Sequence, residues 1–154
     1  MSRLMKNIGG VVVTAIGTVP QSNSGSAING TGLERAVQPG EQIALSCVLH
    51  VQTGATTGTP STISVAGKIQ HSTDNSTWAD YTDPSTNAAA AITAITAAST
   101  SASVDVDLSQ AYRYVRAVVT PAFTGGSSPT IMVSSSIVFG GLRKAPSASR
   151  TVTT

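Results

Sequence analysis

The chain has 154 residues, enough for one domain that buries roughly 70% of the surface of its unfolded chain. Only 10% of the residues are charged, against about 25% in an ordinary soluble domain. Valine and isoleucine together number 26, against 6 leucines, and this balance favours strands over helices. The composition therefore excludes a coiled coil or helical bundle, and it argues against a strongly charged nucleic-acid-binding protein.

The few charges are unevenly placed along the chain, although the formal net charge is only +2. Residues 1–33 carry two basic groups and no acid, residues 34–107 carry all seven acids, and residues 108–154 carry five basic groups and no acid. Basic ends around an acidic middle suit a protein whose ends bind acidic surfaces. The alternative explanation is chance, because so few charges can be distributed unevenly without a functional reason. The candidate partner-binding residues are Arg3, Lys6, Arg143, Lys144 and Arg150.

The first expected strand lies in the apolar run Ile8–Val19, which contains three glycines and no leucine. It is followed by the Ser/Gly-rich stretch 21–32, which we expect to be a long loop or an arm. The clearest strand is Gln42–Gln52, because apolar residues alternate with polar ones along it. Its expected inward face consists of Ile43, Leu45, Cys47, Leu49 and Val51.

Further strands are expected wherever the same alternation returns between turn signals rich in Gly, Pro, Asn and Asp. They are Thr62–His71, Val104–Leu108, Tyr112–Thr120 and Thr130–Phe139, with Leu33–Val37 and Ala90–Ala97 as weaker candidates. About eight strands at this spacing predict an all-β fold: a single antiparallel β-sandwich, jelly-roll-like, with extended N- and C-terminal arms. We expect one domain over 1–154, with a strand and arm in 1–32, the sandwich core in 33–142 and a tail in 143–154.

Tests for catalytic chemistry find little. Cys47 is the only cysteine, so an intrachain disulfide or a Cys-based zinc site is impossible, and a buried, inert thiol is expected. His50 and His71 accompany no nucleophile motif or metal-ligand spacing. Asp105 and Asp107 share a strand face, and a solvated face is the simpler explanation. We therefore predict a non-enzymatic protein with no catalytic residue, metal or cofactor.

The string Ser72–Tyr81 is the most distinctive in the chain. Asp74 and Asn75 suit a tight turn, and Ser72 and Thr77 can bond its free backbone groups. Trp78 would then lead the returning strand and anchor the core. The string resembles the Asp-box of sialidase propellers, with a serine in place of the glycine and one residue fewer, which keeps open a carbohydrate-binding role for Trp78 and Tyr81.

A second distinctive string, Tyr112–Arg116, interleaves aromatic side chains with arginines. Such a surface suits single-stranded nucleic acid, but nothing else in the sequence supports that use. We expect Tyr112, Tyr114 and Arg116 to share one face of a strand, as an exposed or subunit-facing sheet surface.

Several strings taken together resemble the capsid cement, or decoration, proteins of tailed bacteriophages. The resemblance covers about residues 65–142 and is one of style and order. The strings are Gln70–Ser72 with Asp74–Trp78, then Asp107–Arg116, Thr120–Gly126 and Val138–Leu142. It implies a sandwich domain that binds outside an assembled shell as a homodimer or homotrimer, without catalytic residues.

The sequence thus predicts a structural virion protein on the capsid surface, made in the bacterial host cytoplasm, that staples neighbouring major capsid subunits. The expected partners are the major capsid protein and further copies of the chain, with no nucleic acid and no membrane. Two alternatives stay open: a structural component of a phage tail, neck or fibre, and a carbohydrate-binding β-sandwich module.

Overall fold

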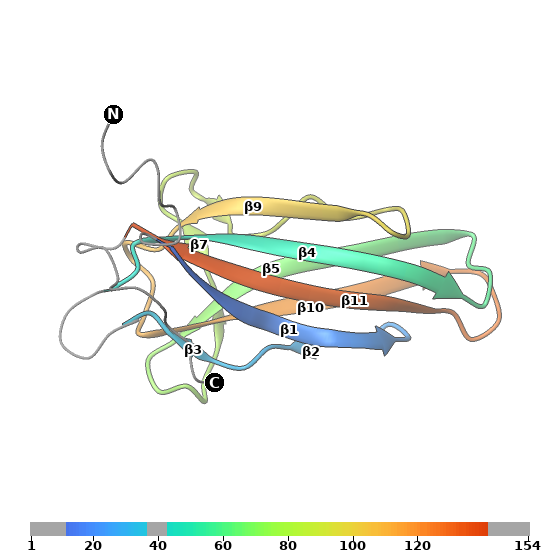
Figure 1. Cartoon of the computed structure of the whole chain (residues 1–154), viewed down its shortest axis with the longest axis horizontal. Coiled ribbons are helices and arrows are strands. Elements are labelled where there is room, and N and C mark those ends of the chain that lie inside the picture. The colour runs from blue at the N-terminus through green and yellow to red at the C-terminus, as the bar shows by residue number, and fades with distance from the viewer. Residues whose placement is uncertain (1–11, 37–42, 142–154) are drawn as a thin grey trace.

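A computed structural model describes residues 12–36 and 43–141, and all the regular structure in these residues is β-strand (Figure 1). The long strands are β1 (Val13–Asn23), β4 (Ser46–Thr57), β5 (Thr62–Ser72), β9 (Ser101–Asp107), β10 (Tyr114–Thr124) and β11 (Thr130–Gly140). The short ones are β2 (Ile28–Asn29), β3 (Leu33–Glu34), β6 (Ala79–Asp80), β7 (Thr82–Asp83) and β8 (Ala88–Ala89). The prediction of an all-β chain is confirmed.

The strands form two antiparallel sheets that face each other. The first sheet has the order β1-β11-β4-β9; the second has the order β2-β10-β5-β6, with β3 also paired to β10. We count β2 and β3 as one interrupted strand. The pairs along the chain are then β1 with β11, β2 and β3 with β10, β4 with β9, and β5 with β6. A chain doubled back and rolled up in this way is a jelly roll. Eight strands build the sandwich, as predicted, and β7 and β8 form a separate small hairpin.

The core lies between the two sheets and follows from the period of two along each strand. In the first sheet Cys47 of β4 lies between Val106 of β9 and Phe139 of β11, and all three are buried. In the second sheet Val65 and Ile69 of β5 are fully buried. The alternation predicted for these strands is therefore correct over their central residues.

The predicted inward face of β4 is wrong at its first residues. Ile43 is 47% exposed, and Ala44 is buried in its place. The ladder of β4 begins only at Ser46, because the backbone N–H of Ala44 donates to the carbonyl of Arg35. Residues 43–45 therefore do not continue the pleat, and the period of two cannot be extended to them.

Other predicted boundaries also need correction. The stretch 21–32 is not wholly loop or arm, since it holds the last residues of β1 and the whole of β2. Residues 90–97 form no strand: Ala91 and Ile95 make isolated bridges to β5, while Ile92 and Ile95 are buried against the core. Of the expected strand Leu33–Val37, the described residues form a strand at Leu33–Glu34 and an isolated bridge from Ala36 to Ile43.

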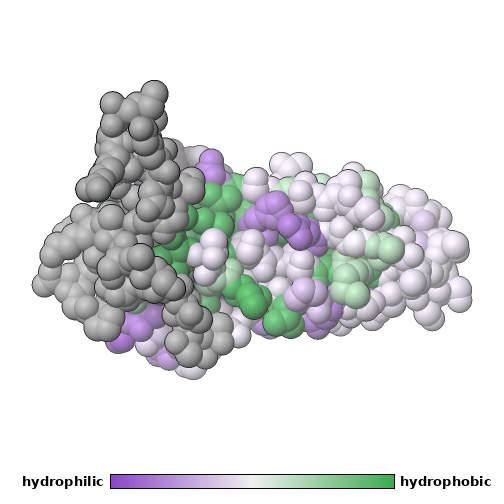
Figure 2. Space-filling model, viewed as in Figure 1, coloured by the Kyte–Doolittle hydropathy of each residue, from purple (hydrophilic) through white to green (hydrophobic). Residues whose placement is uncertain are grey.

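The two ends of the sandwich differ in charge. We call the end where β1, β4 and β10 begin the near end, and the opposite one the far end. The described residues contain ten charged side chains, and all lie in the near half: Glu34, Arg35, Lys68, Asp74, Asp80, Asp83, Asp105, Asp107, Arg113 and Arg116. The far half consists mostly of Ser, Thr, Gly, Ala and apolar residues, with a few amides such as Gln21 and Asn23, and Figure 2 shows its tip in pale shades on the face drawn.

The near end is fastened by the buried side chain of Arg35, which is 6% exposed. Its guanidinium donates to the carbonyl of Ala44 from Nε at 3.2 Å and from Nη2 at 3.0 Å. Nη1 donates to the carbonyls of Ala111 and Tyr112. Arg35 thus joins the chain after β3, the approach to β4 and the approach to β10.

The far end is fastened without charged side chains in the described residues: hydroxyl groups of Ser22, Thr57 and Thr130 join β1, β4 and β11, and the loops meet through their backbones. The loops β4–β5 and β10–β11 lie against each other, and the N–H of Ser127 donates to the carbonyl of Gly58 at 2.9 Å. Gly58 and Gly126 both have positive φ, at 73° and 83°. A Cβ on Gly126 would lie 2.4 Å from the carbonyl oxygen of Gly58, so only glycine permits this approach.

Candidate binding face on the second sheet

The loop between β5 and β6 is organised by one carboxylate. Oδ1 of Asp74 accepts the backbone N–H groups of Ser76 and Thr77 at 2.9 and 2.8 Å, and the hydroxyl of Ser72 at 2.9 Å. These hydrogen bonds, that from Thr77 first, hold the pKa of Asp74 well below its usual range. Asn75 has a φ of 59°, as the predicted tight turn requires. The loop is thereby fixed in one conformation.

Trp78 follows this loop and does not anchor the core, contrary to the prediction. It is half-buried, and the guanidinium carbon of Arg116 lies 4.4 Å from the centre of its ring. Its ring also extends toward Gly32 between β2 and β3, where an added Cβ would lie 2.9 Å from Trp78 Cη2. Trp78 therefore lies across the outer side of the second sheet. A cation–π contact of this kind contributes about 0.5–2 kcal/mol, depending on its desolvation.

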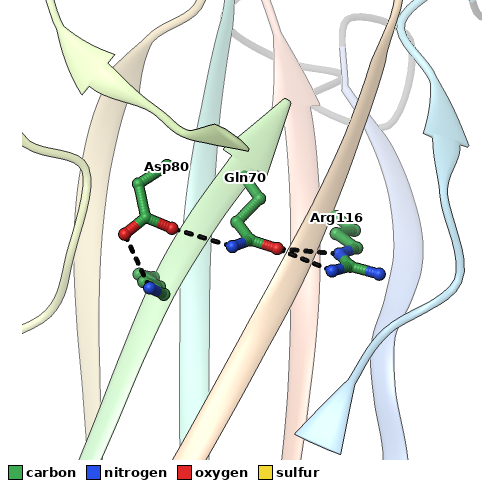
Figure 3. Close-up of polar contacts among 4 residues, drawn as sticks. Gln70, Asp80 and Arg116 are labelled. Carbon is green, nitrogen blue, oxygen red and sulfur yellow. Dashed lines mark hydrogen bonds and ion pairs between the residues drawn. The ribbon is translucent and has the colours of Figure 1, made fainter. Parts of the chain in front are cut away.

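From Arg116 a line of hydrogen bonds crosses three strands (Figure 3). Nε and Nη2 of Arg116 donate to Oε1 of Gln70 at 3.0 and 2.7 Å. Nε2 of Gln70 donates to Oδ1 of Asp80 at 2.8 Å, and Nζ of Lys68 donates to Oδ2 of Asp80 at 2.7 Å. The strand register sets this order, because Arg116 is paired with Gln70, and Gln70 with Asp80. We call Trp78, Arg116, Gln70, Asp80 and Lys68 the ladder face.

The electrostatics of the ladder face follow from these contacts. The hydrogen bonds from Lys68 and then Gln70 lower the pKa of Asp80, so this carboxylate is ionised at neutral pH. Burial lowers the pKa of Arg116. Lys68 and Asp80 are exposed ion-pair partners, with side chains 40% and 57% accessible, and such pairs add about 0–1 kcal/mol. The ladder face therefore orders its polar groups more than it stabilises the fold.

Aromatic and charged groups continue beside the ladder face at the near end. Tyr112 lies before β10, not within it as predicted, and stacks on His71 with ring centres 4.2 Å apart. Tyr112 is 50% exposed. Next to it, Arg113 forms an ion pair with Glu34 at 2.8 Å. Tyr114 and Arg116 share the outer side of β10, as predicted, but Tyr112 does not join them.

The chemistry that this arrangement allows is recognition of another macromolecule. Tryptophan, tyrosine and arginine are the residues most enriched where protein interfaces hold most of their binding energy. Because hydrogen bonds and stacking already fix the side chains of the ladder face, binding would cost little of their conformational freedom. The face crosses three strands, which suits a broad protein surface better than a small molecule.

The five basic residues chosen from the sequence lie outside the described part of the chain: Arg3, Lys6, Arg143, Lys144 and Arg150. Cys47 is 3% exposed and burial raises its pKa to about 12, which confirms the predicted inert thiol. His50 lies on the other face of β4 from Cys47, and its Nε2 is 3.1 Å from Nε2 of Gln52. Within residues 12–36 and 43–141, no group of three or more His, Cys, Asp or Glu side chains is placed to hold a metal ion.

The suggested sugar-binding pair does not form. Tyr81 is 3% exposed, and its hydroxyl donates to the carbonyl of Asp107 at 2.7 Å. Tyr81 therefore faces the core while Trp78 lies on the outer surface, so the two cannot hold one glycan between them.

The sequence singled out both strings that build the ladder face, but it did not bring them together. Trp78 and Asp80 come from Ser72–Tyr81, and Arg116 comes from Tyr112–Arg116. Their contact depends on the pairing of β10 with β5, two strands far apart along the chain. The usable signal was the concentration of the only tryptophan and all three tyrosines in these two strings.

Fold and surface together define a jelly-roll β-sandwich with a polar, aromatic face on its second sheet. No protein-family model matches the chain, and no curated protein does. Among solved structures, it is similar to the crystal structure of the PBSX exported protein XepA, with a TM-score of 0.53 and 16% sequence identity. The match covers 96% of this chain and 42% of XepA, so the chain spans less than half the length of that protein. This likeness shows the fold alone. In the described residues, no helix has the length and apolar character needed to cross a membrane.

Proposed function

We propose that this chain is a non-enzymatic structural protein of a phage particle, and that it uses the ladder face to bind an assembled protein surface. The observation that carries the proposal is the ordered row from Trp78 through Arg116 and Gln70 to Asp80 on an exposed sheet. The fold it shares with XepA, an exported protein of phage PBSX, supports the association with phages.

Within that class we propose a capsid cement protein, which binds the outside of a phage head as a homodimer or homotrimer and staples neighbouring major capsid subunits. Two physical features support this choice. The surface carries many short polar side chains, which form close contacts with little loss of side-chain entropy. A shell also repeats one surface many times, so a modest affinity per copy is amplified when copies are linked. Arg3, Lys6, Arg143, Lys144 and Arg150 would add contacts to acidic shell surfaces.

The test is sedimentation of the purified protein with empty phage capsids, followed by imaging of the pellet. We expect ordered density on the shell at symmetry or pseudo-symmetry axes. Arg116→Ala and Trp78→Ala should each weaken cosedimentation about tenfold, as loss of an interface anchor does. Met132→Ala is the matched control, because Met132 is 45% exposed but belongs to β11 in the first sheet. Circular dichroism of each variant checks that the sandwich is intact.

Charge reversal of Arg143 and Lys144 should also weaken capsid binding without unfolding the domain. If the wild-type protein stays in the supernatant while the capsids sediment, the cement proposal is wrong. A ring-shaped oligomer under the microscope, with no affinity for shells, would instead support a component of the tail, neck or fibre.

A further inference from the structure

The guanidinium of Arg116 uses only part of its hydrogen-bonding capacity within the ladder face. Its Nε and Nη2 donate to Oε1 of Gln70, while Nη1 donates to no atom of the described residues. Figure 3 shows the third nitrogen of Arg116 on the side away from Gln70. A guanidinium carries five N–H donors in a planar fork, so the two on Nη1 and one on Nη2 are left for another molecule. We call these remaining donors the outer edge of Arg116.

Two neighbours hold the outer edge in place. The ring of Trp78 lies against the guanidinium, with 4.4 Å between the guanidinium carbon and the ring centre. Gln70 is fixed in turn, because its Nε2 donates to Oδ1 of Asp80 at 2.8 Å. A ligand that meets the outer edge therefore finds donors whose direction is already set, and its binding costs little side-chain entropy.

The second sheet is interrupted on the side of Arg116 opposite β5. β10 pairs with β3 as far as Val115 and with β2 from Val118, so Arg116 has no ladder partner on this side. The residues of the interruption, 30–32, read Gly-Thr-Gly. None of the three has a large side chain. A group of another molecule can therefore approach the outer edge from this side.

Arg116 is also the cation of this surface that has no acidic partner among the described residues. Lys68 pairs with Asp80. Arg113 pairs with Glu34. The amide oxygen beside Arg116 is neutral and leaves its charge uncompensated. An oriented guanidinium that keeps its charge suits a carboxylate, which accepts two parallel N–H···O bonds from such a fork.

A phosphate group would also fit the outer edge, but the surroundings of Arg116 favour a carboxylate. Nucleic acid binds through several cations that follow its backbone, whereas the other cations of the ladder face and its border are already paired with acids. Asp80 and Glu34 lie on the same side of the sheet and would repel a polyanion. A protein surface that presents a single Asp or Glu among polar groups meets no such repulsion.

We propose that the outer edge of Arg116 binds the carboxylate of an Asp or Glu side chain on the protein surface that the ladder face meets, with Trp78 packed against the same partner. Nη1 and Nη2 each donate to one carboxylate oxygen, and Gln70 keeps the guanidinium turned toward it. Loss of water around the pair strengthens it, because the attraction between charges rises as the effective dielectric constant falls. The inference rests on the proposed function, since it names the group that the ladder face recognises.

The first test uses the protein alone and needs no capsid. The probe is the blocked tripeptide acetyl-Ser-Glu-Ser-amide, with acetyl-Ser-Gln-Ser-amide as its uncharged match at equal ionic strength. NMR follows the Nε–H of Arg116 and the indole N–H of Trp78, which is the only tryptophan in the sequence. We expect both signals to move with the Glu peptide and to stay fixed with the Gln peptide. Equal responses to the two peptides would overturn the proposal.

Two variants separate the fork from its charge. Arg116→Lys keeps the charge but loses the planar fork, so the movement of the Trp78 signal per unit of Glu peptide should fall about tenfold. Arg113→Lys is the matched control, because it makes the same change at an arginine that is already paired with Glu34; its response should equal that of the wild type. A wild-type response in Arg116→Lys overturns the proposal. A trithymidylate that moves the signals at lower concentration than the Glu peptide would show phosphate as the ligand, and it would overturn the carboxylate assignment.

The second test uses empty phage capsids whose carboxylates have been converted to amides with a carbodiimide and glycinamide, and whose integrity has been checked by microscopy. Wild-type protein should bind treated capsids about tenfold more weakly than untreated ones. Arg116→Lys should bind both alike, because its contact with the carboxylate is already lost. Equal losses in the two proteins overturn the inference and leave the capsid proposal standing. Wild-type protein that binds no untreated capsid but responds to the Glu peptide gives the opposite result: the capsid proposal fails and the carboxylate assignment is supported.

Discussion

The near and far ends of the sandwich hold their strands together in different ways. At the near end the buried guanidinium of Arg35 joins three segments through backbone carbonyls, and charged and aromatic side chains cover the outer surface. At the far end the loops β4–β5 and β10–β11 meet backbone to backbone through Gly58 and Gly126, and neither loop contains a charged residue.

This difference teaches where sequence change is tolerated. A side-chain network can be altered one group at a time, and it offers chemistry to a partner. A backbone contact offers no chemistry, and it forbids a side chain at one position while tolerating changes around it. We therefore expect recognition at the near end, and a far end whose role is to close the sandwich.

The largest effect is expected from Arg35→Ala. It leaves the carbonyls of Ala44, Ala111 and Tyr112 without their donor inside the protein, and should lower the free energy of unfolding by about 3–5 kcal/mol. Urea denaturation followed by circular dichroism measures it. Arg113→Ala is the control, because Arg113 is an exposed arginine of the same end. If the two variants have similar stability, Arg35 does not fasten the near end.

A smaller effect is expected from Gly126→Ala at the far end. The new Cβ meets the carbonyl of Gly58 at a positive φ, which should cost about 1–3 kcal/mol. Gly140→Ala is the matched control: Gly140 lies within β11, and its added Cβ would meet only the hydroxyl oxygen of Ser46, at 3.3 Å. A Gly126→Ala protein as stable as Gly140→Ala would show that the two loops are not locked together. Thermal unfolding distinguishes the two outcomes.

The smallest effect is a dependence on pH at the near end. Burial, and then the charge of Arg35, lower the pKa of His71, whose Nδ1 accepts the N–H of Tyr112 at 3.3 Å. As the pH falls below about 6.5, the unfolded chain therefore takes up a proton before the folded one does, and stability is lost. Measurements at pH 7.5 and 5.5 bracket the ordinary pKa of histidine, about 6.5.

His71→Phe keeps an aromatic ring beside Tyr112 but cannot be protonated. Its free energy of unfolding should change less between pH 7.5 and 5.5 than that of the wild type, as measured by urea denaturation at both values. An unchanged slope in His71→Phe would place the pH dependence elsewhere.

Much of the fold could be predicted from local pattern. Alternation located β4, β5, β9, β10 and β11, because each is long and has one buried side. The errors came where the pattern depends on distant contacts. Ile43 faces outward because Ala44 is bonded to Arg35, and residues 90–97 lie over β5 without forming a strand.

The candidate site was predictable only in pieces. The turn at Asp74 was predicted from the types of residue around it, and the structure confirms that turn. Trp78 was expected in the core because tryptophan is large and apolar, yet the pairing of β10 with β5 brings Arg116 beside it on the outer surface. The register of two strands separated by about forty residues is not written in either strand alone.

The thiol of Cys47 has a practical consequence. It is the only sulfhydryl in the sequence, it is buried on β4 between Val106 and Phe139, and its raised pKa keeps it protonated. A thiol reagent can modify it only when β4 separates from its neighbours, so the rate of labelling reports how often the sandwich opens. Because Cys47 is shielded in the same way from reagents in solution, a cysteine introduced on either surface could be labelled with a thiol-reactive probe while Cys47 stays unlabelled.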